Sequence, residues 1–158
     1  MKAIIIYFSL TGRTKMVAEA IAAELGKYEV NVEAITYKKG SKDWWSDRDQ
    51  ALAGDLSNFK YNESIFDPSP YDLICIGVPT NGGRPAYIFD AYIKKSKNFD
   101  GKRVVIFNTC RLFALKTLGN MKSEIEKKGG KVTDQKCFKG LFKLTDEKAR
   151  EFGKFLNQ

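Results

Sequence analysis

The stretch YFSLTGRT, residues 7–14, joins an apolar segment to a sequence with helical periodicity. It begins inside KAIIIYF, residues 2–8, whose nearly continuous β-branched and aromatic composition is typical of a strand covered on both faces of a parallel sheet. After the stretch, apolar residues recur with the spacing of one helix face: Val17, Ala18, Ile21, Ala22 and Leu25. Residues 9–14 are therefore predicted to form the loop between a first strand and a first helix.

The rest of the chain repeats this alternation of short apolar runs and helical patterns. Further strands are expected at residues 29–35, 72–78, 102–108 and 131–138. Helices are expected at residues 42–53, 85–95, 115–125 and 145–156. This order predicts an α/β fold with a doubly wound, five-stranded parallel sheet and helices on both faces, and residues 1–158 are interpreted as a single domain. Ligands of such folds bind beyond the carboxyl ends of the strands, here at residues 9–14, 79–84 and 109–113.

The composition limits the classes of function. The 158 residues contain no histidine, which excludes a mechanism with an imidazole base. Three cysteines, Cys75, Cys110 and Cys137, lack a CxxC spacing, which argues against a disulfide framework or a zinc site. Cys110 precedes Arg111 at an expected helix start, a setting that would lower the pKa of its thiol and permit redox activity. The other two cysteines are expected to be small core residues.

The net charge of +8 comes mainly from lysines that are scattered along the chain. Because no basic block is present, this distribution favours a solvated surface or an acidic protein partner over nucleic acid. The apolar run at residues 3–8 is too short to cross a membrane, and no secretory signal follows Met1-Lys2. We therefore expect a cytoplasmic protein without a membrane span.

The loop at residues 9–14 combines three hydroxyl groups with a glycine. Ser9, Thr11 and Thr14 offer hydrogen-bond donors, and Gly12 permits a sharp turn. The free amides at the start of the following helix attract an anion, so the set favours a terminal phosphate. The alternative is an ordinary N-cap loop, in which Ser and Thr are also common.

Other phosphate-binding motifs do not match the sequence. A P-loop requires GxxxxGK[ST], and a dinucleotide site requires GxGxxG with an acidic residue near the end of the second strand, where this chain has Thr36-Tyr37-Lys38. The aspartates of a phosphoacceptor receiver are missing from the ends of the first and third strands. Cys110-Arg111 lacks the spacing between nucleophile and arginine of a small phosphatase.

The N-terminal residues resemble the flavodoxin signature at the following positions: Ile5, Ile6, Tyr7, Ser9, Gly12, Thr14, Ala18 and Ile21. The similarity extends to GVPTNGGRPA at residues 77–86, placed like the second flavin loop of that family. It also extends to residues 115–132, which look like the family's fourth helix and fifth strand. The resemblance implies a flavodoxin-like sheet of strand order 2-1-3-4-5 and FMN as the cofactor.

By this resemblance, the first loop would bind the FMN phosphate through Ser9, Leu10, Thr11, Gly12, Arg13 and Thr14. Two further sets would face the isoalloxazine ring: Pro79, Thr80, Asn81, Gly82, Gly83 and Arg84, and Thr109, Cys110, Arg111 and Leu112. The glycine pair suits a peptide that reorients toward the flavin, or alternatively a plain tight turn. No catalytic residue and no metal ligand is predicted.

The sequence departs from typical flavodoxins around the expected ring. Flavodoxins commonly place aromatic side chains in the second or third loop, where this chain has only Phe113, at the expected helix start. Three residues could cover the ring instead: Arg84, Arg111 and Leu112. Trp44 and Trp45 are candidates either for the ring or for burial against the sheet.

Three functions are consistent with these features. The leading hypothesis is an FMN-binding electron carrier between redox proteins, with an acidic partner implied by the positive charge. The first alternative is an FMN-dependent NAD(P)H oxidoreductase of quinones or other small acceptors, with Arg84 or Arg111 facing a nucleotide phosphate. The second alternative is a flavodoxin-fold interaction module without a cofactor. The sequence leaves the oligomeric state open.

Overall fold

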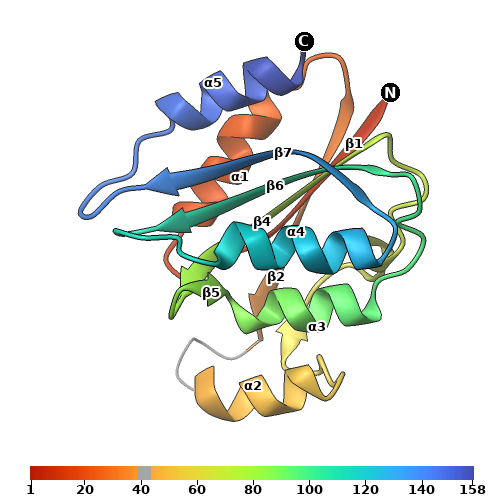
Figure 1. The fold of residues 1–158 in the computed structure, drawn as a ribbon, viewed down its shortest axis with the longest axis vertical. Helices are drawn as coiled ribbons and strands as arrows, with labels where there is room; N and C mark the ends of the chain where they lie inside the picture. Colours follow the sequence, from red (N-terminus) through yellow and green to blue (C-terminus); the bar gives the residue numbers. More distant parts are fainter. Residues whose placement is uncertain (39–43) are drawn as a thin grey trace.

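A computed structural model describes residues 1–38 and 44–158, except for the side chains of residues 44–46. Five parallel strands form its central sheet: β1 (Lys2–Phe8), β2 (Glu29–Tyr37), β4 (Leu73–Asn81), β6 (Arg103–Cys110) and β7 (Lys131–Lys139). They lie in the order β2-β1-β4-β6-β7, which confirms the predicted order of the five main strands. The α/β class with a doubly wound sheet is thus confirmed (Figure 1).

Helices cover both faces of this sheet (Figure 1). One face carries α1 (Arg13–Glu24) and α5 (Glu147–Leu156), which pack against each other. The other face carries α3 (Tyr87–Lys95) and α4 (Thr117–Lys127), and α2 (Trp44–Leu52) packs against α3. In the described residues, no helix has both the length and the apolar character needed to cross a membrane.

Two short strands were not predicted. β3 (Phe59–Lys60) pairs antiparallel with β2, and a single 3-10 turn, η2 (Glu63–Phe66), follows it. β5 (Arg84–Pro85) pairs antiparallel with β4, so Pro85 ends a hairpin and does not begin α3. The hairpin forms because Gly82 and Gly83, at φ 58° and 76°, supply the two positive φ angles of a two-residue turn that matches strand twist.

Two other helix starts differ from the expectation. α4 begins at Thr117 because Leu115, at φ 44°, lies outside the helical region and is 76% exposed. α5 has Asp146 at its N-cap in place of Thr145. The loop between β6 and α4 therefore covers residues 111–116, two positions later than the sequence predicted.

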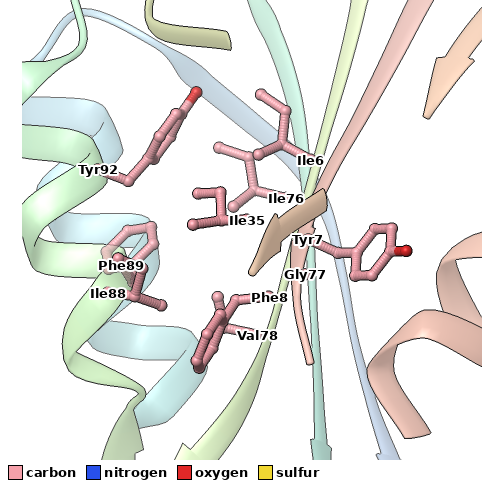
Figure 2. Close-up of a pocket in the computed structure, with 10 residues that line it drawn as sticks. All are labelled: Ile6, Tyr7, Phe8, Ile35, Ile76, Gly77, Val78, Ile88, Phe89 and Tyr92. Atoms are coloured by element: carbon pink, nitrogen blue, oxygen red, sulfur yellow. The ribbon is translucent and has the colours of Figure 1, made fainter. Parts of the chain in front are cut away.

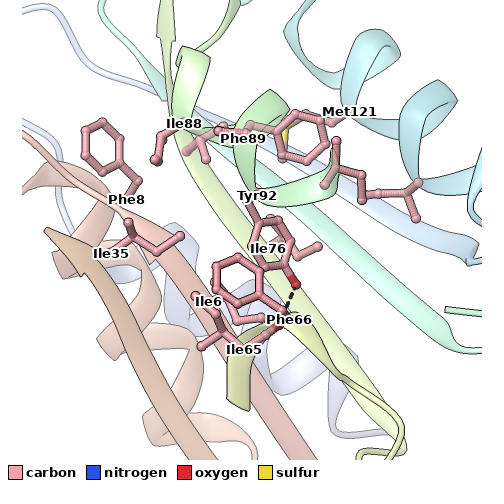
Figure 3. Packing of buried hydrophobic residues seen from close by; sticks show 14 of the residues in the cluster. Ile6, Phe8, Ile35, Ile65, Phe66, Ile76, Ile88, Phe89, Tyr92 and Met121 are labelled. Carbon is pink, nitrogen blue, oxygen red and sulfur yellow. Dashed lines mark hydrogen bonds between the residues drawn. The ribbon is translucent and has the colours of Figure 1, made fainter. Parts of the chain in front are cut away.

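The core between the sheet and α3 is apolar and closely packed (Figure 3). Its buried Tyr92 hydroxyl donates to the carbonyl of Ile65 at 3.0 Å, so the ring adds no unpaired polar group. A gap of about 10 Å³ remains between β1, β4 and α3 (Figure 2). Because it is no larger than one water molecule and its lining is almost entirely apolar, the gap is a packing void and not a ligand site.

Candidate functional site

The loops that follow β1, β4 and β6 meet at the carboxyl edge of the sheet. They enclose a hollow of about 140 Å³ whose lining is Ser9, Leu10, Thr11, Arg13, Thr14, Pro79, Thr80, Asn81, Thr109, Cys110 and Arg111. Every one of these residues belongs to the set predicted from the sequence. The parallel order of the strands brings them together, because it places all three strand ends at one edge.

Five predicted residues lie outside this hollow. Gly12 borders a neighbouring depression beside Phe142, and Gly82 and Arg84 line a second hollow of about 310 Å³ on the other side of the hairpin. At Gly83, a Cβ atom would lie 2.7 Å from Leu115. The fifth residue, Leu112, has an exposed side chain. The hairpin thus separates two concave surfaces that the sequence suggested were one.

The first loop presents donors at the start of α1. The Ser9 hydroxyl accepts the N–H of Gly12 at 3.1 Å, which leaves its own hydrogen for another acceptor. Gly12 adopts φ 86° and begins the helix, with the N–H of Met16 donating to its carbonyl. Neither an acidic residue nor a side-chain cap occupies the described first turn, so its amides remain available to an anion.

A buried hydroxyl pair joins the first loop to the end of β6. Thr14, which is 1% exposed, lies with its Oγ1 atom 2.8 Å from that of Thr109. Only one hydrogen is used between two hydroxyls, so the pair keeps one donor that a ligand can use. Between β6 and β4, the Asn108 side chain donates to the Thr80 hydroxyl at 2.7 Å, and the Thr80 hydroxyl also lies 2.8 Å from that of Thr117.

Arg13 links the first loop to the ends of β6 and β7 through hydrogen bonds that the sequence did not predict. Its guanidinium donates to the carbonyl of Gly140, in the loop after β7, and to that of Cys110 at 3.4 Å. Its Nε atom is buried without a partner, as are Asn81 Nδ2 and Asn108 Oδ1, among the described side chains. Buried polar atoms are normally paired. Three buried atoms without a hydrogen-bond partner at one edge of the sheet therefore indicate room for a polar ligand.

The cysteines differ from the expectation in two ways. Cys110 ends β6, well before α4, so no helix start lowers the pKa of its thiol. Burial, together with Cys137, instead raises the pKa of Cys110 to about 11. Cys137 is half-buried beside Cys110 and is not a core residue, whereas Cys75 lies in the core as predicted.

Two exposed aromatic side chains lie in the loops that follow β6 and β7. Phe113 lies in the loop before α4 and is 68% exposed. The prediction that it lies at the start of the helix was wrong. Phe142, in the loop after β7, is 95% exposed and was not identified from the sequence. The only available signal was its position after a strand end, two residues beyond Gly140. The side chains of Trp44 and Trp45 lie outside the described residues, so both hypotheses for them remain predictions.

The second hollow carries mixed charge. Arg48 and Arg84 line it together with Asp90. Burial and the nearby Glu124 raise the pKa of the Asp90 carboxyl, and the two arginines oppose that shift. This surface therefore combines two arginines with one carboxyl group, whereas the described lining of the first hollow has hydroxyls and no carboxyl group.

The flavodoxin family model matches residues 2–147. The chain belongs to the flavodoxin family. Among curated proteins, no match was found.

Solved structures with the same fold include three flavoproteins, all less than 25% identical to this chain. A flavoprotein from Lactobacillus acidophilus NCFM in complex with FMN shares 24% identity at a TM-score of 0.66 and covers 86% of this chain and 92% of its own. A flavodoxin, WrbA-like protein from Agrobacterium tumefaciens shares 21% identity at a TM-score of 0.65, and the match covers 99% of this chain and 94% of its own. Oxidised flavodoxin 2 from Bacillus cereus shares 20% identity at a TM-score of 0.63, and the match covers 97% of this chain and 95% of its own.

Proposed function

We propose that the chain binds FMN at the carboxyl edge of its sheet and carries electrons between redox proteins. The observation that carries this proposal is the hollow at the start of α1, lined by hydroxyls, free amides and Arg13. The Lactobacillus flavoprotein, which has the same fold, was solved with FMN. When bound, FMN supplies an isoalloxazine ring that accepts and releases electrons.

The residues of the hollow fit the phosphate end of this cofactor. Ser9, Thr11 and Thr14 offer hydroxyls, and the α1 amides and Arg13 add positive potential. At about 140 Å³ the hollow is smaller than most small-molecule pockets, which enclose roughly 300–1,000 Å³. It therefore suits the phosphate and the adjoining chain, and the ring would lie over the open surface near Leu112 and Phe113.

The ionisable side chains around the hollow are compatible with a carrier. Arg13 and Arg111 supply the positive charge of the lining, and burial raises the pKa of Cys110 to about 11, which keeps its thiol neutral near pH 7. The described lining thus offers no group that exchanges a proton with a substrate near pH 7. Electron transfer needs no such group. With a net charge of +8, we expect the redox partner to be acidic.

One observation favours the reductase as a second candidate. The hollow of about 310 Å³ beyond the hairpin places Arg48 and Arg84 on a surface that adjoins the proposed ring position through Asn81 and Gly82. Two arginines are suited to the phosphates of a pyridine nucleotide. In this case the nucleotide would approach the flavin from the side opposite to the phosphate loop.

Rapid mixing separates the two candidates. The protein is loaded with FMN and mixed anaerobically with NADPH, with NADH, and with a reduced acidic redox protein. The carrier predicts fast flavin bleaching only by the protein donor. Fast bleaching by a pyridine nucleotide that is lost in Arg48→Gln and Arg84→Gln would establish the reductase instead. Failure to bind FMN at all would leave the cofactor-free interaction module.

A further inference from the structure

Two thiols meet at the end of the sheet beside the proposed FMN site. The Sγ atoms of Cys110 and Cys137 lie 3.3 Å apart, although the residues are 27 positions apart in sequence. Cys137 pairs with Asn108 across β6 and β7, and Cys110 lies two residues beyond Asn108. Because side chains alternate along a strand, both thiols point to the same face of the sheet.

The two thiols differ in access. Cys137 is half-buried on β7, which is an edge strand, whereas Cys110 is buried and lines the hollow. We propose that Cys110 and Cys137 form a reversible intramolecular disulfide, with a peroxide as the oxidant that reaches Cys137 first. Cys75, deep in the core, takes no part in this pair.

The reaction balances in two steps. The Cys137 sulfur attacks one oxygen of hydrogen peroxide, the O–O bond breaks, and water leaves with the thiol proton, so that Cys137 becomes a sulfenic acid. The Cys110 sulfur then attacks the Cys137 sulfur, and the hydroxyl leaves as a second water with the Cys110 proton. The thiols lose two electrons in total, and the peroxide gains them.

The strand geometry makes this bond easy to reduce. Cys110 and Cys137 are diagonal and not direct neighbours in this parallel ladder, and two residues of strand rise together with the spacing between strands place their Cα atoms about 8 Å apart. Disulfides usually join Cα atoms closer than about 6.8 Å, so the bond requires the strand ends to move together. Both residues lie at or near the end of a strand, where loops allow that movement. Strained disulfides of this kind are the labile ones.

The same movement would reach the proposed phosphate site, a consequence that rests on the proposed function. The carbonyl of Cys110 accepts hydrogen bonds from Arg13 at 3.4 Å and from the N–H of Gly140 at 3.1 Å. Arg13 also binds Gly140, so one small network joins the thiol pair to the first loop. Drawing Cys110 toward β7 displaces an acceptor of Arg13, and we expect weaker FMN binding in the oxidised protein.

The disulfide is tested first without FMN. The full chain is treated with hydrogen peroxide, the remaining thiols are alkylated in denaturant, and the peptides are mapped by mass spectrometry. We expect a Cys110–Cys137 cross-link that is lost in Cys137→Ser, retained in the matched control Cys75→Ala, and removed by a thiol reductant without denaturant. Free thiols at both Cys110 and Cys137 after oxidation, sulfinic acid at Cys137, or cross-links between molecules would each overturn the proposal.

The coupling to the phosphate site is tested by titrating the reduced and the oxidised protein with FMN. Loss of one charge-assisted hydrogen bond predicts binding about tenfold weaker after oxidation, with no such change in Cys137→Ser. Equal FMN affinity in both states would overturn the coupling. A cross-link in a protein that binds FMN in neither state would support the disulfide and reject the proposed function.

Discussion

The two halves of the carboxyl edge are built differently. The phosphate half is made by residues 9–14 with the ends of β6 and β7. A buried hydrogen bond between Thr14 and Thr109 and a partly buried one from Arg13 to Gly140 hold it together. The ring half, made by residues 79–85 and 111–116, presents a glycine turn and exposed apolar side chains.

This difference indicates where the cofactor affinity comes from. Donors that are already fixed lose little entropy when a ligand binds, whereas exposed loops must be ordered. The phosphate half also concentrates cations and helix amides without a carboxylate among its described lining. We therefore expect the phosphate to dominate FMN binding and the ring half to contribute little.

The largest effect is expected in the phosphate half. Thr14→Ala removes one hydroxyl and leaves that of Thr109 without its partner. Loss of a hydrogen bond to a charged group costs about 1.5–3 kcal/mol, which corresponds to roughly 10- to 150-fold weaker FMN binding. Fluorescence titration of the protein with FMN measures this change.

Thr14→Ser is the matched control, because it keeps the hydroxyl and should bind FMN nearly as well as the unmodified protein. Wild-type affinity in Thr14→Ala would show that the buried hydroxyl pair serves only packing.

A smaller effect is expected on stability in the ring half. Gly82→Ala and Gly83→Ala both force alanine to a positive φ, which costs about 1–2 kcal/mol. At Gly83 the new methyl group also meets Leu115, whereas Gly82 faces open space. Urea unfolding should therefore show the greater loss for Gly83→Ala.

The excess loss at Gly83 should shrink when Leu115→Ala removes the Cδ1 atom at 2.7 Å, while the Cβ atom at 3.3 Å keeps part of the contact. If both glycine variants instead match the unmodified protein, the hairpin turn is not the one described.

A pH-dependent effect is expected at Asp90, beside the second hollow. Burial raises the pKa of this carboxyl above its ordinary 3.8, so the folded protein binds the proton more tightly than the unfolded chain does. Stability from this group is therefore present at low pH and is lost as the pH rises from about 3.8 through the folded value. Asp90→Asn should remove that loss.

Because Asp90 is only partly buried and solvent screens its charge, the expected gain of Asp90→Asn at neutral pH is below about 1 kcal/mol. Urea midpoints measured at pH 3 and pH 7 check it. A variant less stable than the unmodified protein at pH 7 would mean that the attraction of Arg84 and Arg48 outweighs burial.

The smallest effect is expected for the exposed aromatic ring of the third loop. Phe113→Ala should change the free energy of unfolding by less than about 0.5 kcal/mol, since little of the side chain is buried. Thermal unfolding, with Phe142→Ala as the matched control, tests this. A loss above about 1 kcal/mol would show that the ring half is packed, which would remove the contrast between the two halves.

The five main strands were predictable because most of them carry strong local signals. β1, β4 and β6 are buried along most of their length and read as continuous apolar runs. β3 and β5 are two residues long, too short for any periodicity. Pro85 misled the prediction, since a proline before a helical pattern usually begins the helix, and here the preceding glycine turn draws it into a strand.

The lining of the first hollow was predictable for a related reason: in a parallel sheet, strand ends meet at one edge. What the sequence did not reveal are contacts between distant positions. Arg13 binds Gly140 across 127 residues, and Cys110 meets Cys137 across 27. Such pairs depend on the register of β6 against β7, for which no local pattern provides a signal.

The central claim is that the phosphate half dominates cofactor binding. Titration of the apoprotein with FMN and, in parallel, with riboflavin, which carries the same ring without the phosphate, tests it most directly. Two charge-assisted hydrogen bonds predict riboflavin binding at least about 100-fold weaker than FMN binding. Equal affinities for the two flavins would contradict the account, because the loop at the start of α1 would then hold no phosphate.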